Sequence, residues 1–235
     1  KADIFYKLRE PFEKIANSKY LFILKGFIWL LRYAFTRYPF KGLGIDGWAN
    51  TKGNITIVNY TLNIEDESKG SHIFKSKYWN SLPDRLIEMK HDINWLNMYI
   101  KDKNLPNSFV AKEKIKKYNN DKNQNHIFLD SFISIRLIKR VLLKWLSFVF
   151  KVYPIRVSKV LPRINNVNFY PFISIDWNNS FFGPSLVSNI LYLELFNKAF
   201  QSLPKQSLLI YLYENISWEK AMIYSWKKYK HDQVI

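Results

Sequence analysis

Residues 55–62 read Ile-Thr-Ile-Val-Asn-Tyr-Thr-Leu, and residues 93–100 read Ile-Asn-Trp-Leu-Asn-Met-Tyr-Ile. Both stretches are rich in β-branched and aromatic residues, which predicts two strands. Between them, Ser81 and Pro83 predict the start of a helix, because Ser caps helix N-termini and Pro suits the first turn. The order strand, helix, strand is typical of a parallel sheet.

The same alternation continues along the rest of the chain. We therefore expect an α/β fold with a Rossmann-like, mostly parallel sheet and helices on both faces in residues 54–235. Because the last three residues look like a strand that has just begun, we expect a continuation after them. The further helices are expected at 111–118, 184–203 and 218–229, and the further strands at 126–129, 172–175, 208–213 and 233–235.

Length and composition exclude several classes of protein. The chain has 235 residues, of which 48% are hydrophobic, so it can bury a core and is too apolar to be disordered. It contains no cysteine. This excludes disulfide scaffolds, thiolate zinc sites and cysteine nucleophiles.

The net charge of +17 is concentrated in two segments. Residues 1–53 hold 10 basic and 4 acidic side chains, and residues 131–163 hold 8 basic and none that is acidic. Such a charge usually indicates an anionic partner. We expect residues 1–53 to form a basic amphipathic helix, spanning about 5–38, and a linker.

The second basic segment predicts an amphipathic helix over 131–151. Its apolar face covers a core or lies in a membrane interface, and Trp145 and Phe148 opposite an all-basic face favour the interface. No run reaches the roughly 18–20 apolar residues of a membrane span, and the start does not resemble a secretory signal. We therefore expect a cytoplasmic protein, peripheral at the inner membrane and held there by residues 20–38 and 131–152. The cations expected to face an anionic membrane surface are Lys25, Arg32, Arg136, Lys139, Arg140 and Lys144.

No motif indicates a cofactor or a metal. Gly42-Leu-Gly-Ile-Asp-Gly47 matches G-x-G-x-x-G, but the dinucleotide fingerprint follows a strand and opens a helix, whereas here a helix precedes and a strand follows. We interpret it as a turn or linker. The four histidines lie far apart without metal-ligand spacing.

Three acidic residues come directly after predicted strands, namely Asp130, Asp176 and Glu214. In an open parallel sheet, ligands bind beyond the carboxyl ends of the strands, where a carboxylate can accept a proton or bind a hydroxyl. Each also has a structural interpretation. Asp130 can cap the basic helix, Asp176 can order the loop after it, and Glu214 can lie near the N-terminus of the following helix.

The loop after the first predicted strand contains a cation and two aromatic residues, Lys77, Tyr78 and Trp79. Aromatic faces stack on sugar rings or bases, and a lysine neutralises phosphate. Alternatively, Tyr78 and Trp79 hold the start of the helix at Ser81.

Four stretches together resemble a bacterial surface-carbohydrate (O-antigen) biosynthesis family similar to glycosyltransferases with two Rossmann domains, the GT-B type. Its most specific parts are Asp176-Trp177 with Ser180-Phe-Phe-Gly183, and Glu214-Asn215 with Trp218-Glu219. The resemblance implies an N-terminal, acceptor-side domain, with a sugar nucleotide donor bound mainly by a half that follows Ile235. The four stretches are 78–96, 126–132, 176–196 and 211–231.

On this interpretation, Glu214 is the base or the acceptor-positioning carboxylate, Asp176 and Glu219 bind hydroxyls, and Trp79 and Trp218 are stacking surfaces. The acceptor is expected to be a lipid-linked or growing saccharide. Two other hypotheses remain: a non-catalytic nucleic-acid-binding module, and a structural partner in a polysaccharide-assembly complex. Nucleic acid is not expected, because the basic residues share helices with large apolar faces and no nucleic-acid motif occurs.

Overall fold

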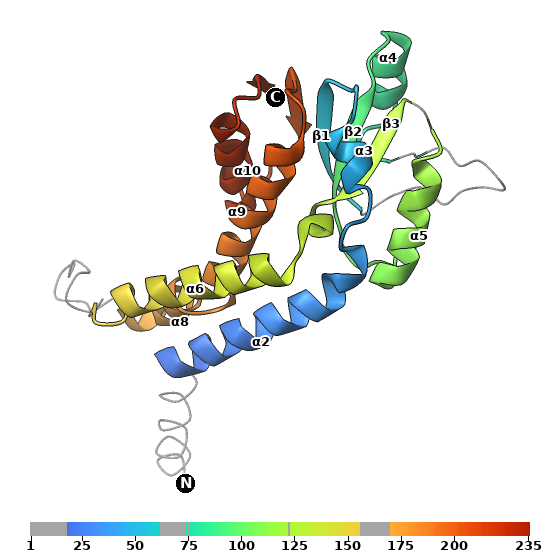
Figure 1. The fold of residues 1–235 in the computed structure, drawn as a ribbon. Coiled ribbons are helices and arrows are strands. Elements are labelled where there is room, and N and C mark those ends of the chain that lie inside the picture. Colours follow the sequence, from blue (N-terminus) through green and yellow to red (C-terminus); the bar gives the residue numbers. More distant parts are fainter. Residues whose placement is uncertain (1–17, 62–73, 75, 122, 156–169) are drawn as a thin grey trace. The chain divides into compact units, whose positions relative to one another are not determined.

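The computed structural model describes residues 18–61, 74, 76–121, 123–155 and 170–235 (Figure 1). Contacts divide these residues into two units. The helical unit contains the described residues up to Phe35 and from Arg136 to Leu191, and the sheet unit contains those from Thr36 to Ile135 and from Tyr192 to Ile235. This division differs from the predicted domain boundary at residues 53 and 54, which stays a prediction.

The sheet unit is built on a five-stranded sheet in which every pairing is parallel. The strand order is β3-β2-β1-β4-β5, and Ile57 in the central strand pairs with Trp95 on one side and Ile210 on the other. The predicted Rossmann-like α/β fold is confirmed. The strands are β1 (Ile55–Tyr60), β2 (Ile93–Met98), β3 (Gln124–Phe128), β4 (Leu208–Tyr211) and β5 (Gln233–Val234).

Helices cover both faces of this sheet (Figure 1). On one face, α4 (Leu82–Glu88) and α5 (Ser108–Tyr118) enclose an apolar core that includes Ile57 and Trp95. The other face is covered by α3 (Ile45–Ala49), the end of α9 (Pro184–Ser202) and α10 (Ser217–Lys228). All six residues of β2 are buried, which explains its continuous run of large side chains.

Capping residues explain where two helices begin. Asn107 accepts hydrogen bonds from the backbone N–H groups of Phe109 and Val110, so α5 starts three residues before its predicted position. Ser81 occupies the N-cap position of α4 as predicted, although its side chain makes no capping hydrogen bond. Pro83 lies in the first turn of α4, where its fixed φ suits the start of a helix.

The helical unit is formed by α2 (Lys19–Arg37) as far as Phe35, α6 (Ile135–Val152) from Arg136, α8 (Tyr170–Phe181) and the first half of α9. The strand predicted at 172–175 is wrong, because these residues belong to α8. A short apolar run such as Phe-Ile-Ser-Ile does not distinguish a strand from a helix segment by its periodicity.

Helices α2 and α6 lie side by side and run in opposite directions (Figure 1). Near one end, Lys19 Nζ donates to the Tyr153 carbonyl oxygen at 2.6 Å. Further along, Gly26 faces the indole of Trp145 so closely that an added Cβ atom would lie 2.6 Å from its ring. Glycine is required at this crossing because the two helices touch there.

Within the described ranges, no helix is both long enough and apolar enough to cross a bilayer.

Candidate functional site at the carboxyl edge of the sheet

The strand order places a topological switch point between β1 and β4. The connection after β1 leads to β2 on one side, and the connection after β4 leads to β5 on the other. The two connections leave the sheet in opposite directions, and in open parallel sheets ligands bind at such a switch point, beyond the carboxyl ends of the strands. Residues that follow β1 and β4 are therefore the first candidates for a ligand site.

Two predicted acidic residues, Glu214 and Glu219, are joined by a hydrogen bond in the segment after β4. The backbone N–H of Glu214 donates to Glu219 Oε1 at 2.7 Å. Asn215 between them has a positive φ of 56°, a conformation that asparagine adopts more readily than most residues, and it turns the chain into α10. Glu219 is 2% exposed and lies in the first turn of α10, where the helix dipole favours a negative charge, whereas the Glu214 side chain is exposed.

Tyr60, the last residue of β1, lies against this carboxylate segment. Its hydroxyl accepts a hydrogen bond from Trp218 Nε1 at 2.8 Å, and the two rings meet edge to face. Burial raises the pKa of Tyr60 above its ordinary value, and the nearby Glu214 carboxylate raises it further. The Tyr60 hydroxyl therefore keeps its proton at neutral pH and can donate it to a ligand or to Glu214.

Two more tyrosines extend this polar edge. Burial and then the Glu219 carboxylate raise the pKa of Tyr211, the last residue of β4. Tyr192 on α9 is affected in the same way, since burial and then the Asp130 carboxylate raise its pKa to about 12. Both side chains stay neutral at physiological pH and offer hydroxyl groups as donors.

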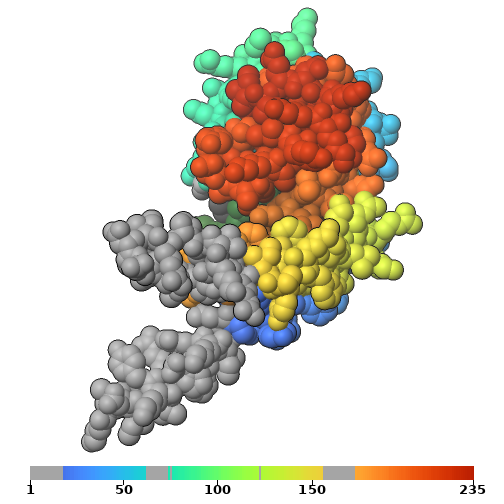
Figure 2. All heavy atoms as spheres, turned by 90° about the vertical axis from the view of Figure 1, so that its left-hand side faces the viewer, coloured from blue at the N-terminus to red at the C-terminus, as the bar shows by residue number. Residues whose placement is uncertain are grey.

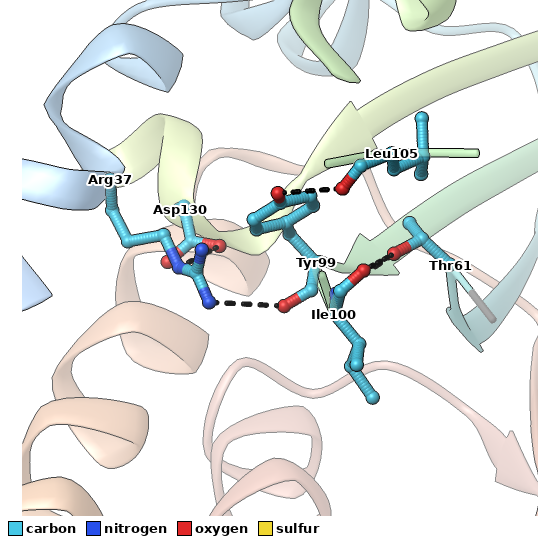
Figure 3. Close-up of polar contacts among 6 residues, drawn as sticks. All are labelled: Arg37, Thr61, Tyr99, Ile100, Leu105 and Asp130. Atoms are coloured by element: carbon cyan, nitrogen blue, oxygen red, sulfur yellow. Dashed lines mark hydrogen bonds and ion pairs between the residues drawn. The ribbon is translucent and has the colours of Figure 1, made fainter. Parts of the chain in front are cut away.

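Beyond β2 and β3 the edge is held by an ion pair, drawn in Figure 3. Arg37 Nε lies 3.8 Å from Asp130 Oδ2, and Arg37 also donates to the Tyr99 carbonyl oxygen at 3.3 Å. Its guanidinium group lies over the Tyr99 ring, 4.3 Å from the centroid. Asp130 is buried, so its charge is balanced by Arg37 and it is not a capping residue of α6, which begins only at Ile135.

The three predicted site residues in the loop after β1 differ in their exposure. Lys77 and Tyr78 are exposed, and Lys77 borders a hollow of about 200 Å³. Trp79 is 7% exposed and donates from Nε1 to Asn59 Oδ1 at 2.8 Å. Its ring packs in the core, which favours the structural interpretation of this aromatic residue over stacking on a ligand.

Trp218 is buried as well. Its indole stacks on Phe196 with the ring centroids 5.9 Å apart, and its N–H is used by Tyr60. Trp218 thus holds Tyr60 in position rather than offering an open stacking face.

The sequence-based reason for placing Asp176 at the carboxyl edge of the sheet does not hold. Asp176 was expected to follow a strand, but it lies exposed on α8 in the helical unit. The physical reason is the wrong strand prediction for 172–175, since the carboxyl-end argument applies only to a residue that follows a strand.

The basic residues predicted to face a membrane are all exposed in the helical unit. Figure 2 shows the side chains of α6, in yellow, at the surface. Most of the apolar face of α6 is covered, because Val141, Trp145 and Val149 are buried, whereas Phe148 on that face is 38% exposed. The burial of these three residues favours the interpretation in which this face covers a core. The exposed basic residues are Lys25, Arg32, Arg136, Lys139, Arg140 and Lys144.

Sequence reasoning missed Tyr60, Tyr192, Tyr211 and Arg37. The sequence does hold a signal for Tyr60 and Tyr211, because each lies near the carboxyl end of a predicted strand. Nothing in the sequence marks Arg37 or Tyr192, since both come from helices and reach the edge only through packing.

These side chains can act together on a hydroxyl-rich ligand. The three neutral tyrosine hydroxyls can bind it, and the exposed Glu214 carboxylate, whose backbone is fixed by Glu219, can accept a proton from it. Among the residues placed by the structure, no group of three or more His, Asp or Glu side chains is arranged to hold a metal ion. Comparisons with protein-family models, with curated proteins and with solved structures find no match to this chain.

Proposed function

We propose that this chain is the acceptor-side domain of a membrane-associated glycosyltransferase in bacterial surface polysaccharide (O-antigen) biosynthesis. The proposal joins the family resemblance to one structural observation. That observation is the exposed carboxylate of Glu214 at the switch point between β1 and β4, with its backbone fixed by Glu219.

The expected chemistry follows from these side chains. An acceptor sugar presents hydroxyl groups, which the Tyr60 and Tyr211 hydroxyls and the Glu214 carboxylate can bind. Glu214 then accepts the proton of the attacking hydroxyl as its oxygen bonds to the anomeric carbon of the donor sugar, while the bond from that carbon to the phosphate breaks and the nucleotide leaves with the electron pair. The donor is a sugar nucleotide, held mainly by residues beyond this chain, and the acceptor is a lipid-linked or growing saccharide.

The charge of the helical unit supports a place at the inner membrane. Its described residues include eight Lys and Arg side chains and a single acid, Asp176. Anionic lipids attract such a surface by about 1 kcal/mol per cation near the headgroups. A peripheral cytoplasmic enzyme with lipid-linked acceptors would gain access to them in this way.

The experiment that tests the proposal substitutes Glu214→Gln in the native protein that carries this chain. We expect sugar transfer from a panel of labelled sugar nucleotides to membrane acceptors to fall by a factor of about 100 or more, because a general base contributes about that much. Glu113→Gln is the matched control. Glu113 is an exposed acid on α5, paired with Lys116 at 2.8 Å, and its loss should leave transfer unchanged.

Other outcomes would decide against the proposal. Near-normal transfer by Glu214→Gln would remove the base role. Loss of polysaccharide assembly without loss of transfer would indicate a structural partner. Salt-sensitive binding to random duplex DNA, with no vesicle binding, would favour the nucleic-acid module.

A further inference from the structure

Apolar residues occupy most sides of helix α2, and its exposed cations Lys25 and Arg32 lie on one narrow side. A soluble surface helix normally has a broad polar face, so α2 has more apolar surface than one face of a core needs. In α2 the inner face is covered, with Phe22, Gly26 and Leu30 buried. Its contacts include the Trp145 indole of α6 beside Gly26.

The opposite face of α2 carries a stripe of large apolar side chains that are 40–77% exposed. Their spacing of three and four residues places them within an arc of about 100° on the helix, and no charged residue falls inside it. We name this surface the α2 stripe. It consists of Tyr20, Leu24, Phe27, Ile28, Leu31 and Phe35.

Cations border the α2 stripe on one side. Lys25 and Arg32 lie beyond one edge of the arc, and both side chains are exposed. The outer face of α6 in the same unit adds five cations and two large exposed apolar side chains, Leu143 and Phe150. No acidic residue occurs in 18–35 or 136–155.

This combination identifies the occupant of the stripe. Helices with an exposed apolar face, bordering Lys and Arg and few acids bind at the interface of anionic bilayers, where the apolar side chains enter the acyl boundary. A second copy of the chain fits less well, because two such units, each with a net charge of +7 on its described residues, would repel at close range.

We infer that the α2 stripe inserts into the interface of an anionic phospholipid bilayer, with Lys25 and Arg32 at the headgroups. The inference rests on the membrane part of the proposed function and adds the surface that makes the contact. The sequence-based assignment placed both residues 20–38 and residues 131–152 at the membrane. The inference keeps the first segment and names the face of α2 that makes the contact.

The first test is co-sedimentation with vesicles of phosphatidylcholine alone or mixed with phosphatidylglycerol. We expect the wild-type chain to bind the anionic vesicles only. The triple variant Leu24→Ser, Ile28→Ser, Leu31→Ser should bind at least about tenfold more weakly, because it lacks three apolar side chains that would leave water on entering the bilayer. Phe109→Ser is the control, since Phe109 on α5 is 68% exposed and lies in the sheet unit.

A second measurement does not depend on the folding of the triple variant. Because the chain has no cysteine, a single Ile28→Cys variant can carry one environment-sensitive fluorophore. Ile28 is 54% exposed, so the label replaces a surface side chain. We expect its emission to shift to the blue on adding anionic vesicles, whereas a label on Phe109→Cys should not respond.

Three results would overturn the inference. Unchanged vesicle binding by the triple variant, with no shift of the Ile28 label, would show attachment by charge alone and leave the proposed function standing. If the wild-type chain bound no vesicle, both this inference and the membrane part of the proposed function would be wrong. A wild-type dimer that the triple variant converts to a monomer, without vesicle binding, would assign the stripe to a second copy. The transferase proposal is tested separately, by Glu214→Gln.

Discussion

At the scale of single residues, the sheet unit buries a histidine that has no hydrogen-bond partner for its ring. His126 in β3 is fully buried, stacks on Trp95 at 5.7 Å, and also contacts Phe74 and Tyr118. Neither ring nitrogen has a partner among the described residues. Burial therefore lowers the pKa of His126 to about 3, so the ring is neutral in the folded state.

This predicts a pH-dependent stability. The folded-state pKa lies below the unfolded value of about 6.5, so the stabilising contribution is complete above pH 6.5. It is lost by about 1.4 kcal/mol per pH unit as the pH falls toward 3. In His126→Phe the ring shape remains and the proton site is absent. We expect its free energy of unfolding, measured in urea, to exceed that of the wild type increasingly between pH 6 and pH 4.

The outcome against this prediction is a difference between the two proteins that stays constant over that pH range. Position 126 would then not titrate on unfolding, and the acid sensitivity of the protein would come from its carboxylates alone.

At the scale of helices, the hydrophobic pattern identified apolar faces but not what covers them. Residues 131–151 have the cleanest amphipathic pattern of the chain, and their apolar face packs inside the helical unit. The pattern of α2 is weaker because apolar residues occupy most of its sides, and there one apolar face is left exposed. A core and a bilayer interface both select apolar side chains, so composition does not separate them.

The crossing of α2 and α6 can be tested at Gly26. A side chain at this position would overlap the Trp145 ring, because a Cβ atom already falls 2.6 Å from it. We expect Gly26→Leu to lower the free energy of unfolding by about 1–3 kcal/mol, as overpacking usually does. Urea unfolding followed by circular dichroism measures this.

Leu24→Ala on the same helix is the control, because Leu24 is exposed and its truncation should stay within about 0.5 kcal/mol. Equal stability of Gly26→Leu and the wild type would mean that α2 does not pack against Trp145 in solution.

At the scale of the whole molecule, the net charge of +17 opposes folding through repulsion between cations. Salt screens this repulsion, since the Debye length falls to about 10 Å at 0.1 M. We expect the thermal unfolding midpoint to rise by several degrees between low and moderate NaCl concentrations. KCl should act equally if screening is the cause, and an unchanged or lower midpoint would contradict the prediction.

Most of the sheet unit could be predicted from the sequence, because its strands are local runs of β-branched and aromatic residues separated by turn and cap signals. This holds for β1, β2 and β4 and for the helices between them. It fails for residues 172–175, where four apolar residues fit a strand and a helix equally well.

The candidate site was predictable only in part. The sequence alone determined an α/β fold with a parallel sheet, a concentration of positive charge in two helical segments, and carboxylates at Asp130 and Glu214 after strands. Only the tertiary structure decided that Asp130 is balanced by Arg37, that Trp218 holds Tyr60, and that Asp176 lies on a helix. It also decided which apolar helix face is covered. The reason is that strand and helix patterns depend on neighbouring residues, whereas ion pairs and covered faces depend on residues far apart in the chain.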